Sequence, residues 1–431
     1  MRWWLYDLMM RALQPWVRRK LARRAVSEPL YAEHIEQRFG RYDTQAMTRV
    51  DVWVHAVSLG EARAAGVLLQ ALRQQRPGLR VLLTHGTATG MAQGRLSLQA
   101  GDVQAWLPWD TRAAVNGFLD HFNPRLGLLI ETEVWPNLVR ACAARGLPLI
   151  LANARLSEPS LQKAMRLSFW SRPAYAALTR VWAQTEADAA RLTQLGVTQV
   201  RTLGNLKFDA QPDAAQIAQG RALSKQLARP VLLLASSREG EEAAWAQALT
   251  QHPGDYLPCV VPRHPQRFDA VAELLQAQGW HVLRRSQWPA DPPAWLEATS
   301  APHTVLLGDT LGEMPMYYAL AQVALMGGSF ERFGGQNLIE ALACACPVVL
   351  GPHTYNFEQV SLDALQAGAA IRSEHMADGV KWAVDICAQA ERQQAMSAQG
   401  LALLAAHRGV ADTMARWALT QLDQSVTSAV H

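Results

Sequence analysis

Residues 50–61 read VDVWVHAVSLGE, and this stretch decides the fold. Its apolar run Val50–Val57 predicts a strand, and Gly60 permits a tight turn into a helix predicted over Glu61–Gln74. Short apolar runs and helical patterns then alternate up to residue 209. The further predicted strands are Arg80–Thr84, Leu126–Ile130, Leu149–Ala152, Val181–Gln184 and Val200–Leu203. This alternation is typical of an α/β domain built on a parallel sheet.

The same rhythm restarts after a polar passage rich in alanine and glutamine, Asp209–Arg229. The predicted strands of this second part are Val231–Ala235, Leu257–Val261, His281–Leu283, Val305–Gly308, Val323–Met326 and Pro347–Leu350. Because one core rarely serves as many as 431 residues, we expect two domains. The predicted fold class is therefore α/β, with doubly wound domains at residues 46–209 and 210–431 facing each other across a cleft. Residues 1–45 are expected to form a separate amino-terminal segment.

Composition and charge argue against several classes of protein. A content of 49% hydrophobic and 18% charged residues indicates a globular chain, and a net charge of +4 is too small to require a nucleic-acid partner. The chain lacks a G-x-G-x-x-G after a strand, a phosphate-binding P-loop, H-E-x-x-H and D-x-D, so we expect neither a dinucleotide cofactor nor a metal. The cysteines lack paired spacing, which predicts reduced thiols in a cytosolic compartment. They are Cys142, Cys259, Cys344, Cys346 and Cys387.

The amino-terminal residues 1–24, MRWWLYDLMMRALQPWVRRKLARR, combine tryptophans with a basic block. Arg2, Asp7, Arg11 and Pro15 interrupt the apolar run too early for a bilayer span. Interfacial tryptophans beside the cations of residues 18–24 suit the headgroup zone of an anionic leaflet, and the positive-inside bias favours the cytoplasmic face. We therefore predict a membrane-associating helix. The alternative is a helix that packs on the first domain through its aromatic side chains.

Charged side chains follow the predicted strands of the first domain, where ligands of such sheets bind. Glu61 opens a helix and aims a carboxylate into the cleft, although it could simply complement the helix dipole. Glu131 and Glu133 stand two apart after a strand, so at least one should face the cleft. Glu133 could instead cap the next helix, since Pro136 suits a first helical turn. Lys207 lies between apolar neighbours at the domain junction, where a solvated linker lysine is the alternative.

The second domain carries the features of an anion site. Arg263 in a rigid turn after a strand offers a guanidinium suited to phosphate or carboxylate. Small residues over 308–314 let backbone amides approach a ligand. The glycine-rich loop 326–340 leads into a helix whose amino-terminal N–H groups would face an anion. Asn337 and Glu340 lie beside it, and a carboxylate there suits ribose hydroxyls. These features predict a nucleotide or sugar-nucleotide site.

Eight motifs in this order and spacing closely resemble the Kdo transferases of lipopolysaccharide synthesis. They are HAVSLGE, IETEVWPN, LANARLS, GNLKFD, VPRHP, GDTLGEM, GGSFERFGGQNLIEA and GPHTYNF, and the resemblance extends from the amino-terminal segment to about Phe357. It implies the GT-B fold of two Rossmann-like domains. It also implies transfer of 3-deoxy-D-manno-octulosonic acid (Kdo) from CMP-Kdo to a lipid A precursor, lipid IVA. The implied reaction inverts the anomeric centre without metal or cofactor, at the cytoplasmic face of the inner membrane.

The resemblance also implies roles for individual residues. Glu61 would be the general base, and Glu131 and Lys207 would stabilise the transition state. CMP would be bound by Pro262, Arg263, Gly312, Glu313, Met314, Asn337, Leu338, Ile339 and Glu340. Gln336 stands where many members would have histidine. Two other functions stay open: a nucleotide-sugar epimerase with the same two domains, and a catalytically inert membrane-associated binder of nucleotide sugars, which would not need Glu61.

Overall fold

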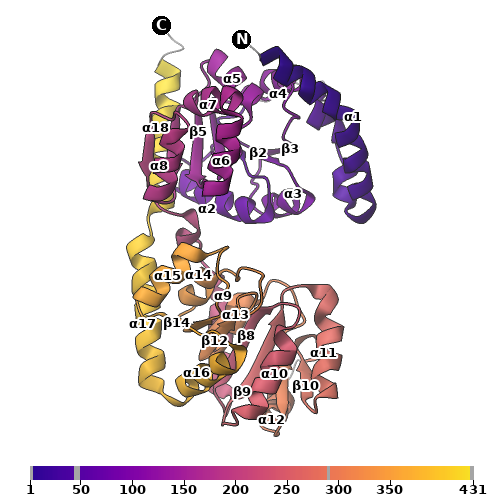
Figure 1. Ribbon diagram of the computed structural model, residues 1–431, viewed down its shortest axis with the longest axis vertical. Helices are drawn as coiled ribbons and strands as arrows, with labels where there is room; N and C mark the ends of the chain where they lie inside the picture. The colour runs from indigo at the N-terminus through magenta and orange to yellow at the C-terminus, as the bar shows by residue number, and fades with distance from the viewer. Residues whose placement is uncertain (1–2, 43–48, 289–291, 428–431) are drawn as a thin grey trace. The chain divides into compact units, whose positions relative to one another are not determined.

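The computed structural model describes residues 3–42, 49–288 and 292–427. The chain forms two compact units (Figure 1). Unit 1 comprises Met1–Asp209 and Arg408–His431, and unit 2 comprises Ala210–His407. Each unit is built on a parallel sheet, so the prediction of two α/β domains is confirmed.

The sheet of unit 1 has the order β3-β2-β1-β4-β5-β6-β7 within the described residues, and every neighbouring pair is parallel. Its strands are β1 (Val52–His55), β2 (Val81–His85), β3 (Val103–Trp106), β4 (Leu126–Ile130), β5 (Leu149–Ala154), β6 (Arg180–Ala183) and β7 (Val200–Thr202). The sequence did not predict β3, a four-residue strand at the sheet edge in which Val103 and Gln104 are half-buried.

Helices cover both faces of this sheet. They are α1 (Trp3–Ser27), α2 (Leu59–Gln75), α3 (Ala88–Arg95), α4 (Arg112–Phe122), α5 (Pro136–Ala144), α6 (Glu158–Arg166), α7 (Ser168–Ala176), α8 (Glu186–Gln194) and α18 (Val410–Thr427), with 3-10 turns η1 (Pro29–Ala32), η2 (Ile35–Phe39) and η3 (Leu206–Asp209). Side chains of β1 alternate between the two cores, as the pleat of a strand requires. Val52 and Val54 pack in the core that contains α2 and α18, and Trp53 packs in the core that contains α4 and α5.

The carboxyl-terminal helix α18 belongs to unit 1, so the predicted second domain 210–431 is wrong beyond His407. Met414, Ala418 and Leu422 of α18 are fully buried, and the helix packs on α2. An apolar helical pattern predicts a buried face. The pattern does not say on which of the two units that face will pack. Here the chain returns to unit 1.

The passage Asp209–Arg229, expected as a polar connection, contains a helix, α9 (Ala214–Gln226). Asp209 is the last residue of η3 and holds the returning chain in place. Its carboxylate accepts hydrogen bonds from the backbone N–H groups of Gly409 at 2.7 Å and Ala411 at 2.6 Å. One side chain therefore ties the point where the chain leaves unit 1 to the point where it comes back.

The inner face of α1 packs on unit 1, so the described residues of segment 1–45 do not form a separate domain. Tyr6 and Asp7 are buried. The Tyr6 hydroxyl donates to Asp110 at 2.8 Å, and the Asp7 carboxylate accepts from the backbone N–H of Arg112 at 2.7 Å. The alternative of a helix packed on the first domain is therefore confirmed for this face.

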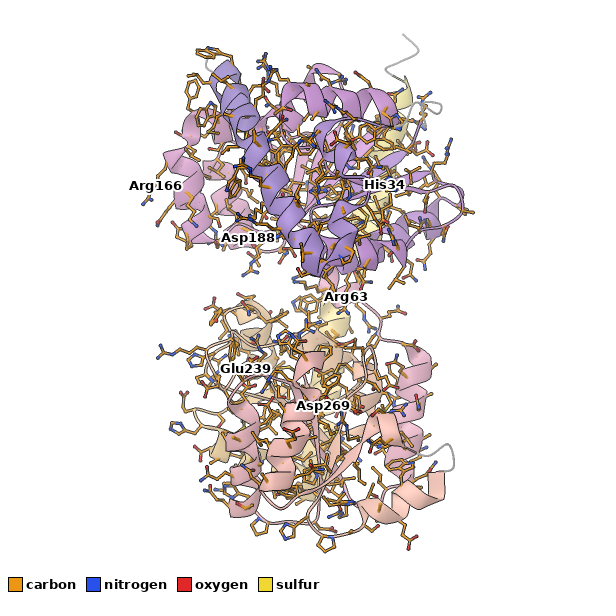
Figure 2. The ribbon with its side chains drawn as sticks, turned by 90° about the vertical axis from the view of Figure 1, so that its right-hand side faces the viewer. His34, Arg63, Arg166, Asp188, Glu239 and Asp269 are labelled. Atoms are coloured by element: carbon orange, nitrogen blue, oxygen red, sulfur yellow. The ribbon has the colours of Figure 1, made fainter. Side chains whose placement is uncertain are left out.

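Helix α1 runs along the outside of unit 1 (Figure 2), and its outer face carries exposed apolar side chains. Trp4 and Trp16 are 58% and 59% exposed. The other exposed apolar residues of this face are Leu5, Leu8, Met9 and Leu13. We call these six residues the outer apolar face. Among the helices that the structure describes, none is long and apolar enough to cross a bilayer.

Unit 2 repeats the architecture, with the strand order β10-β11-β9-β8-β12-β13-β14 over its described residues. Its strands are β8 (Val231–Ser237), β9 (Leu257–Pro262), β10 (His281–Arg284), β11 (Thr304–Leu307), β12 (Val323–Met326), β13 (Val348–Leu350) and β14 (Ala370–Arg372). Its other helices are α10 (Glu241–Gln251), α11 (Phe268–Ala277), α12 (Pro292–Thr299), α13 (Met314–Leu320), α14 (Leu338–Ala343), α15 (Glu358–Gln366), α16 (Met376–Ala388) and α17 (Ala390–His407). The sequence did not predict β14, a three-residue strand at the sheet edge.

Candidate functional site

Glu61 lies in the first turn of α2, just beyond the carboxyl end of β1. Ser58 caps this helix, and its hydroxyl accepts a hydrogen bond from the backbone N–H of Glu61 at 3.3 Å. The Glu61 carboxylate turns back and accepts from the backbone N–H of Val57, with Oε2 2.6 Å from that nitrogen. This reciprocal arrangement is a capping box shifted by one residue. Glu61 therefore has the structural role that the sequence left open.

The same carboxylate has an unusual proton affinity. Burial raises the pKa of Glu61 to about 7, against the opposing hydrogen bond from Val57, and the nearby charges of Glu131 and Glu133 add to the increase. A carboxyl group that titrates near neutral pH can accept a proton from a substrate hydroxyl and release it again. Capping alone does not need this property.

Glu131 and Glu133 occupy the loop after β4, beside Glu61. Glu131 has a φ of +66°, a left-handed conformation that costs free energy in a residue other than glycine and that occurs often at functional sites. Its Oε1 lies 3.8 Å from the Nζ of Lys207. The Glu133 carboxylate accepts from the indole N–H of Trp135 at 2.8 Å. The alternative that Glu133 caps the next helix is wrong, because the first-turn N–H groups of Asn137 and Leu138 in α5 donate to the Asp110 carboxylate, at 3.0 and 2.8 Å.

Lys207 is held in place from both sides of its backbone. The N–H of Leu206 donates to the Asn153 Oδ1 at 3.0 Å, and the N–H of Lys207 donates to the Asn205 Oδ1 at 3.0 Å. Asn153 itself is fully buried in a left-handed conformation. A lysine fixed in this way and paired with Glu131 is not a solvated linker residue. Sequence reasoning did not single out Asn153, although it lies in one of the quoted motifs.

The predicted donor residues of unit 2 come after β9, β11 and β12. Pro262 ends β9, and Arg263 follows it with an exposed side chain, while its backbone N–H donates to the Ser237 carbonyl at 3.0 Å. The nearby Arg267 has a structural role, because its guanidinium donates to both oxygens of the buried Glu242 at 2.7 and 2.9 Å. Arg263 is therefore the arginine of this turn that faces solvent.

Gly312, Glu313 and Met314 form the entry to α13. Gly312 has a φ of +81°, which explains the glycine, and Met314 is the first residue of the helix. The Glu313 carboxylate accepts from the Arg285 guanidinium at 2.8 Å. Glu313 would therefore contact a ligand with a side chain that already binds Arg285, a residue that the sequence analysis did not single out.

In the glycine-rich loop after β12, several backbone amides are bound by a carboxylate of the chain itself. Glu241, which is 1% exposed, accepts from the backbone N–H groups of Gly328 at 2.7 Å, Phe330 at 3.1 Å and Glu331 at 3.4 Å, and from that of Arg238 at 2.8 Å. Burial raises the pKa of Glu241, and these hydrogen bonds oppose the increase. The predicted anion site concerned the amino-terminal N–H groups of the following helix, α14 (Leu338–Ala343), and it stays a prediction.

The helix after this loop, α14, presents the remaining predicted residues. Asn337 caps it, with Oδ1 accepting from the N–H of Ile339 at 3.2 Å. The side chains of Leu338 and Ile339 lie in the core, so these residues can reach a ligand only through their backbone. Glu340 is half-buried in the first turn. Among the described residues, no three His, Cys, Asp or Glu side chains gather where they could hold a metal ion.

Two Rossmann-like units, each with polar side chains beyond its parallel strands, define a protein of the GT-B-like architecture. A solved UDP-GlcNAc 2-epimerase from Neisseria meningitidis, bound to UDP-GlcNAc, shares this fold at a TM-score of 0.54 and 13% identity, covering 80% of this chain and 94% of the epimerase chain. A solved C-terminal CMP-Kdo binding domain of WaaA from Acinetobacter baumannii is 30% identical, covers 44% of this chain and 99% of that domain, and has a TM-score of 0.40.

The sequence comparisons identify the family. The family described as 3-deoxy-D-manno-octulosonic-acid transferase (kdotransferase) matches residues 33–210. The 3-deoxy-D-manno-octulosonic acid transferase of Bordetella pertussis is 46% identical over 426 residues, which cover 94% of this chain and 96% of that protein. The chain belongs to the 3-deoxy-D-manno-octulosonic acid transferase family, and the resemblance carried by the eight motifs is confirmed.

Proposed function

We propose that this chain transfers Kdo from CMP-Kdo to a lipid A precursor at a membrane surface, with inversion and without a metal ion. Membership of the Kdo transferase family supports the glycosyl transfer. The observation that carries the mechanism is Glu61, a carboxyl group beyond the carboxyl end of β1 whose pKa burial raises to about 7.

Unit 1 would bind the acceptor, because it contains the general base. The Val57 N–H fixes Oε2 of Glu61 at 2.6 Å, which leaves Oε1, 3.3 Å from the Ser58 hydroxyl, to take the proton. The acceptor hydroxyl gives this proton to Glu61 while its oxygen attacks the anomeric carbon of Kdo. The bond from that carbon to the CMP phosphate breaks, and the electron pair leaves with CMP. A single displacement of this kind inverts the anomeric centre.

Lys207 and Glu131 would act on charge that develops in this step. The backbone of Lys207 is fixed by hydrogen bonds and its ammonium group is paired with one carboxylate, so this cation is positioned to stabilise an anion, either the Kdo carboxylate or the departing phosphate. In unit 2, Arg263 would bind the CMP phosphate. Asn337 and Glu340, at the start of α14, would bind the nucleoside.

The outer apolar face of α1 would dock on the cytoplasmic face of an inner membrane. Apolar side chains lie beside the exposed cations Arg19, Lys20, Arg23 and Arg24, a combination that binds anionic lipid surfaces. Leu8→Ser/Leu13→Ser should weaken sedimentation with phosphatidylglycerol vesicles at least about tenfold. The matched control is Leu362→Ser/Leu401→Ser, which changes two similarly exposed leucines of unit 2. Equal binding by both variants would place the membrane contact elsewhere.

The transfer itself is tested by incubating the full chain with CMP-Kdo and tetraacylated lipid A precursor, followed by mass spectrometry of the lipid. The proposal requires lipid with added Kdo and stoichiometric CMP. Release of CMP without a lipid product would indicate a hydrolase. An altered nucleotide sugar would indicate an epimerase, and CMP-Kdo binding without turnover would indicate an inert binder.

A further inference from the structure

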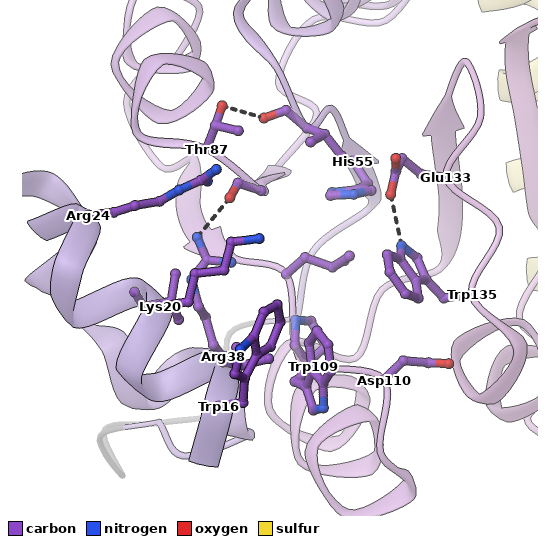
Figure 3. Close-up of a pocket in the computed structure, with 16 residues that line it drawn as sticks. Trp16, Lys20, Arg24, Arg38, His55, Thr87, Trp109, Asp110, Glu133 and Trp135 are labelled. Carbon is purple, nitrogen blue, oxygen red and sulfur yellow. Dashed lines mark hydrogen bonds between the residues drawn. The ribbon is translucent and has the colours of Figure 1, made fainter. Parts of the chain in front are cut away.

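A pocket of about 400 Å³ lies between α1 and the carboxyl ends of β1 and β2 in unit 1 (Figure 3). Its outer wall is α1, its base is the end of the sheet, and its far wall is formed by loops after β3 and β4. Parallel sheets bind their ligands at this edge. The lining residues used below are Lys20, Arg24, Arg38, His55, Val57 and Trp109.

His55 at the base of the pocket has an unpartnered polar atom. The side chain is completely buried, and its Nδ1 lies 3.0 Å from the Thr84 hydroxyl and 3.1 Å from the Thr84 carbonyl oxygen. The hydroxyl suits either tautomer, but the carbonyl can only accept, so we assign the proton to Nδ1. Burial lowers the pKa of His55 to about 3, and the ring is neutral. Nε2 is then an acceptor, and it has no hydrogen-bond partner. A buried acceptor without a partner is costly, so this atom calls for a donor from a ligand, such as a hydroxyl group.

Three cations line the same pocket. Lys20 and Arg24 extend from α1 toward it, and Arg38 lies deeper (Figure 3). Arg38 donates to the Gly86 carbonyl at 2.9 Å, but its buried Nε–H has no partner. Within the part of the chain that the structure describes, no carboxylate lies within 4.0 Å of these three cations. The lining therefore has three cations, none of them in an ion pair, against two carboxylates, and this excess of positive charge suits an anion such as a phosphate.

The two carboxylates in the lining, Asp110 and Glu133, bind other groups and not these cations. Both oxygens of Asp110 are taken: Oδ2 accepts from the Tyr6 hydroxyl, and Oδ1 accepts from the N–H of Leu138. Glu133 is engaged by the indole of Trp135. Three indole rings, those of Trp16, Trp109 and Trp135, complete the walls. Such flat apolar surfaces pack against the C–H face of a sugar ring and leave its hydroxyl groups to the polar base.

We propose that this pocket binds the phosphorylated sugar headgroup of the lipid acceptor, with the phosphate at Lys20, Arg24 and Arg38 and a sugar hydroxyl donating to Nε2 of His55. This inference rests on the proposed function and names the part of the acceptor that unit 1 holds. Val57 lines the pocket and its N–H donates to the Glu61 carboxylate, so this one residue joins the pocket wall to the proposed base. The same helix α1 thus forms the pocket wall and carries the outer apolar face.

The test is a binding titration of the full chain with a deacylated, phosphorylated glucosamine disaccharide, which is soluble and needs no membrane. Lys20→Ala/Arg24→Ala removes two pocket cations. Arg19→Ala/Arg23→Ala removes two exposed cations of the same helix that do not line the pocket, with the same change of net charge. We expect the first pair to weaken binding at least about tenfold and the second to change it less than about twofold. Equal losses, or no binding by the parent chain at millimolar ligand, would overturn the proposal.

Two further arms identify what the pocket holds. The disaccharide without phosphate should bind at least about tenfold more weakly to the parent chain. Phosphatidylglycerol vesicles should bind the Lys20→Ala/Arg24→Ala and Arg19→Ala/Arg23→Ala variants equally. A larger loss of vesicle binding in Lys20→Ala/Arg24→Ala would mean that the pocket takes a phospholipid headgroup instead of a sugar. His55→Phe should weaken disaccharide binding without affecting the vesicles. If His55→Phe does not fold, the disaccharide affinities of the two double variants of α1 decide the question.

The pocket and the reaction can fail separately. Binding of the disaccharide without any Kdo transfer would refute the proposed function and leave the pocket assigned. Kdo transfer with an unchanged KM for the acceptor in Lys20→Ala/Arg24→Ala would refute the pocket and leave the reaction standing.

Discussion

Replacing Glu61 by glutamine separates its two roles, because glutamine can still cap a helix in a capping box but cannot accept a proton. The side-chain amide oxygen in Glu61→Gln can still accept from the Val57 N–H, so the start of α2 should stay intact. General-base catalysis typically contributes about 10²–10⁴-fold. We therefore expect Glu61→Gln to lower kcat of Kdo transfer by at least about 10²-fold, with the Kd for CMP unchanged, since CMP is assigned to unit 2.

The pH profile tests the same assignment with the parent enzyme. With a pKa of about 7, Glu61 is half deprotonated at pH 7 and about one-tenth deprotonated at pH 6. The deprotonated form is the active one, so kcat/KM should rise with pH, level off above about pH 8, and fall about tenfold per pH unit well below 7. The residual activity of Glu61→Gln should lack this dependence. Asp110 also titrates in this range, because burial raises its pKa to about 6.

A stability measurement checks that the variant reports chemistry and not misfolding. The folded chain holds the Glu61 proton more tightly than the unfolded chain, so the stabilisation by that proton is complete below pH 4.5 and is lost as the pH rises through 7. Glu61→Gln removes this loss and should be more stable than the parent at pH 8, by at most about 3 kcal/mol, and equally stable at about pH 4. A loss of activity below about tenfold, or an unchanged acid limb in Glu61→Gln, would refute the base assignment.

Other expectations follow from contacts described above. Lys207→Ala should slow single-turnover transfer at saturating donor about 10²–10³-fold, with partial rescue in Lys207→Arg, and an unaltered rate at an unaltered Tm would remove Lys207 from the site. Glu241→Gln should speed hydrogen exchange at the amides of residues 328–331 and weaken CMP binding, because one amide oxygen cannot accept the hydrogen bonds that the carboxylate accepts. Unchanged exchange would contradict this. Asp209→Ala should cost about 1–2 kcal/mol in urea denaturation by leaving the N–H groups of Gly409 and Ala411 without their acceptor. A midpoint equal to that of the parent would show that water replaces the carboxylate.

The central strands of both sheets could be predicted from the sequence because they are continuous apolar runs buried on both faces. Strands β4 and β12 match the predicted bounds. The edge strands β3 and β14 were not predicted, because neither stands out as an apolar run of its own, whereas the edge strands β7 and β10 were predicted although none of their residues is buried. The placement of α18 depends on contacts between residues far apart in the chain, such as Arg76 with Asp423, 347 positions later, which no local pattern contains.

The candidate site was predictable where a charged residue follows a strand, as Glu61, Glu131 and Lys207 do. The hydrogen bonds of the loop at Gly328 were not predicted, because the residue that accepts them, Glu241, lies 87 positions earlier and resembles an ordinary first-turn acid. The pocket beneath α1 was also missed. Its polar base, His55, lies inside a strand, and a lone histidine in an apolar run does not reveal whether its second nitrogen will find a partner.

The link between Asp209 and Gly409 also sets the order in which a ribosome can complete the protein. The strands of unit 1 are all translated by Thr202, yet α2 must wait for α18 to cover it. At about 5–20 residues per second, the intervening residues of unit 2 take about 10–40 s to emerge. During that time the nascent first unit exposes an apolar groove along α2, and the second unit can fold before it. If translation stops soon after residue 407, the second unit should therefore be folded, while the first unit lacks α18 and leaves the apolar face of α2 exposed.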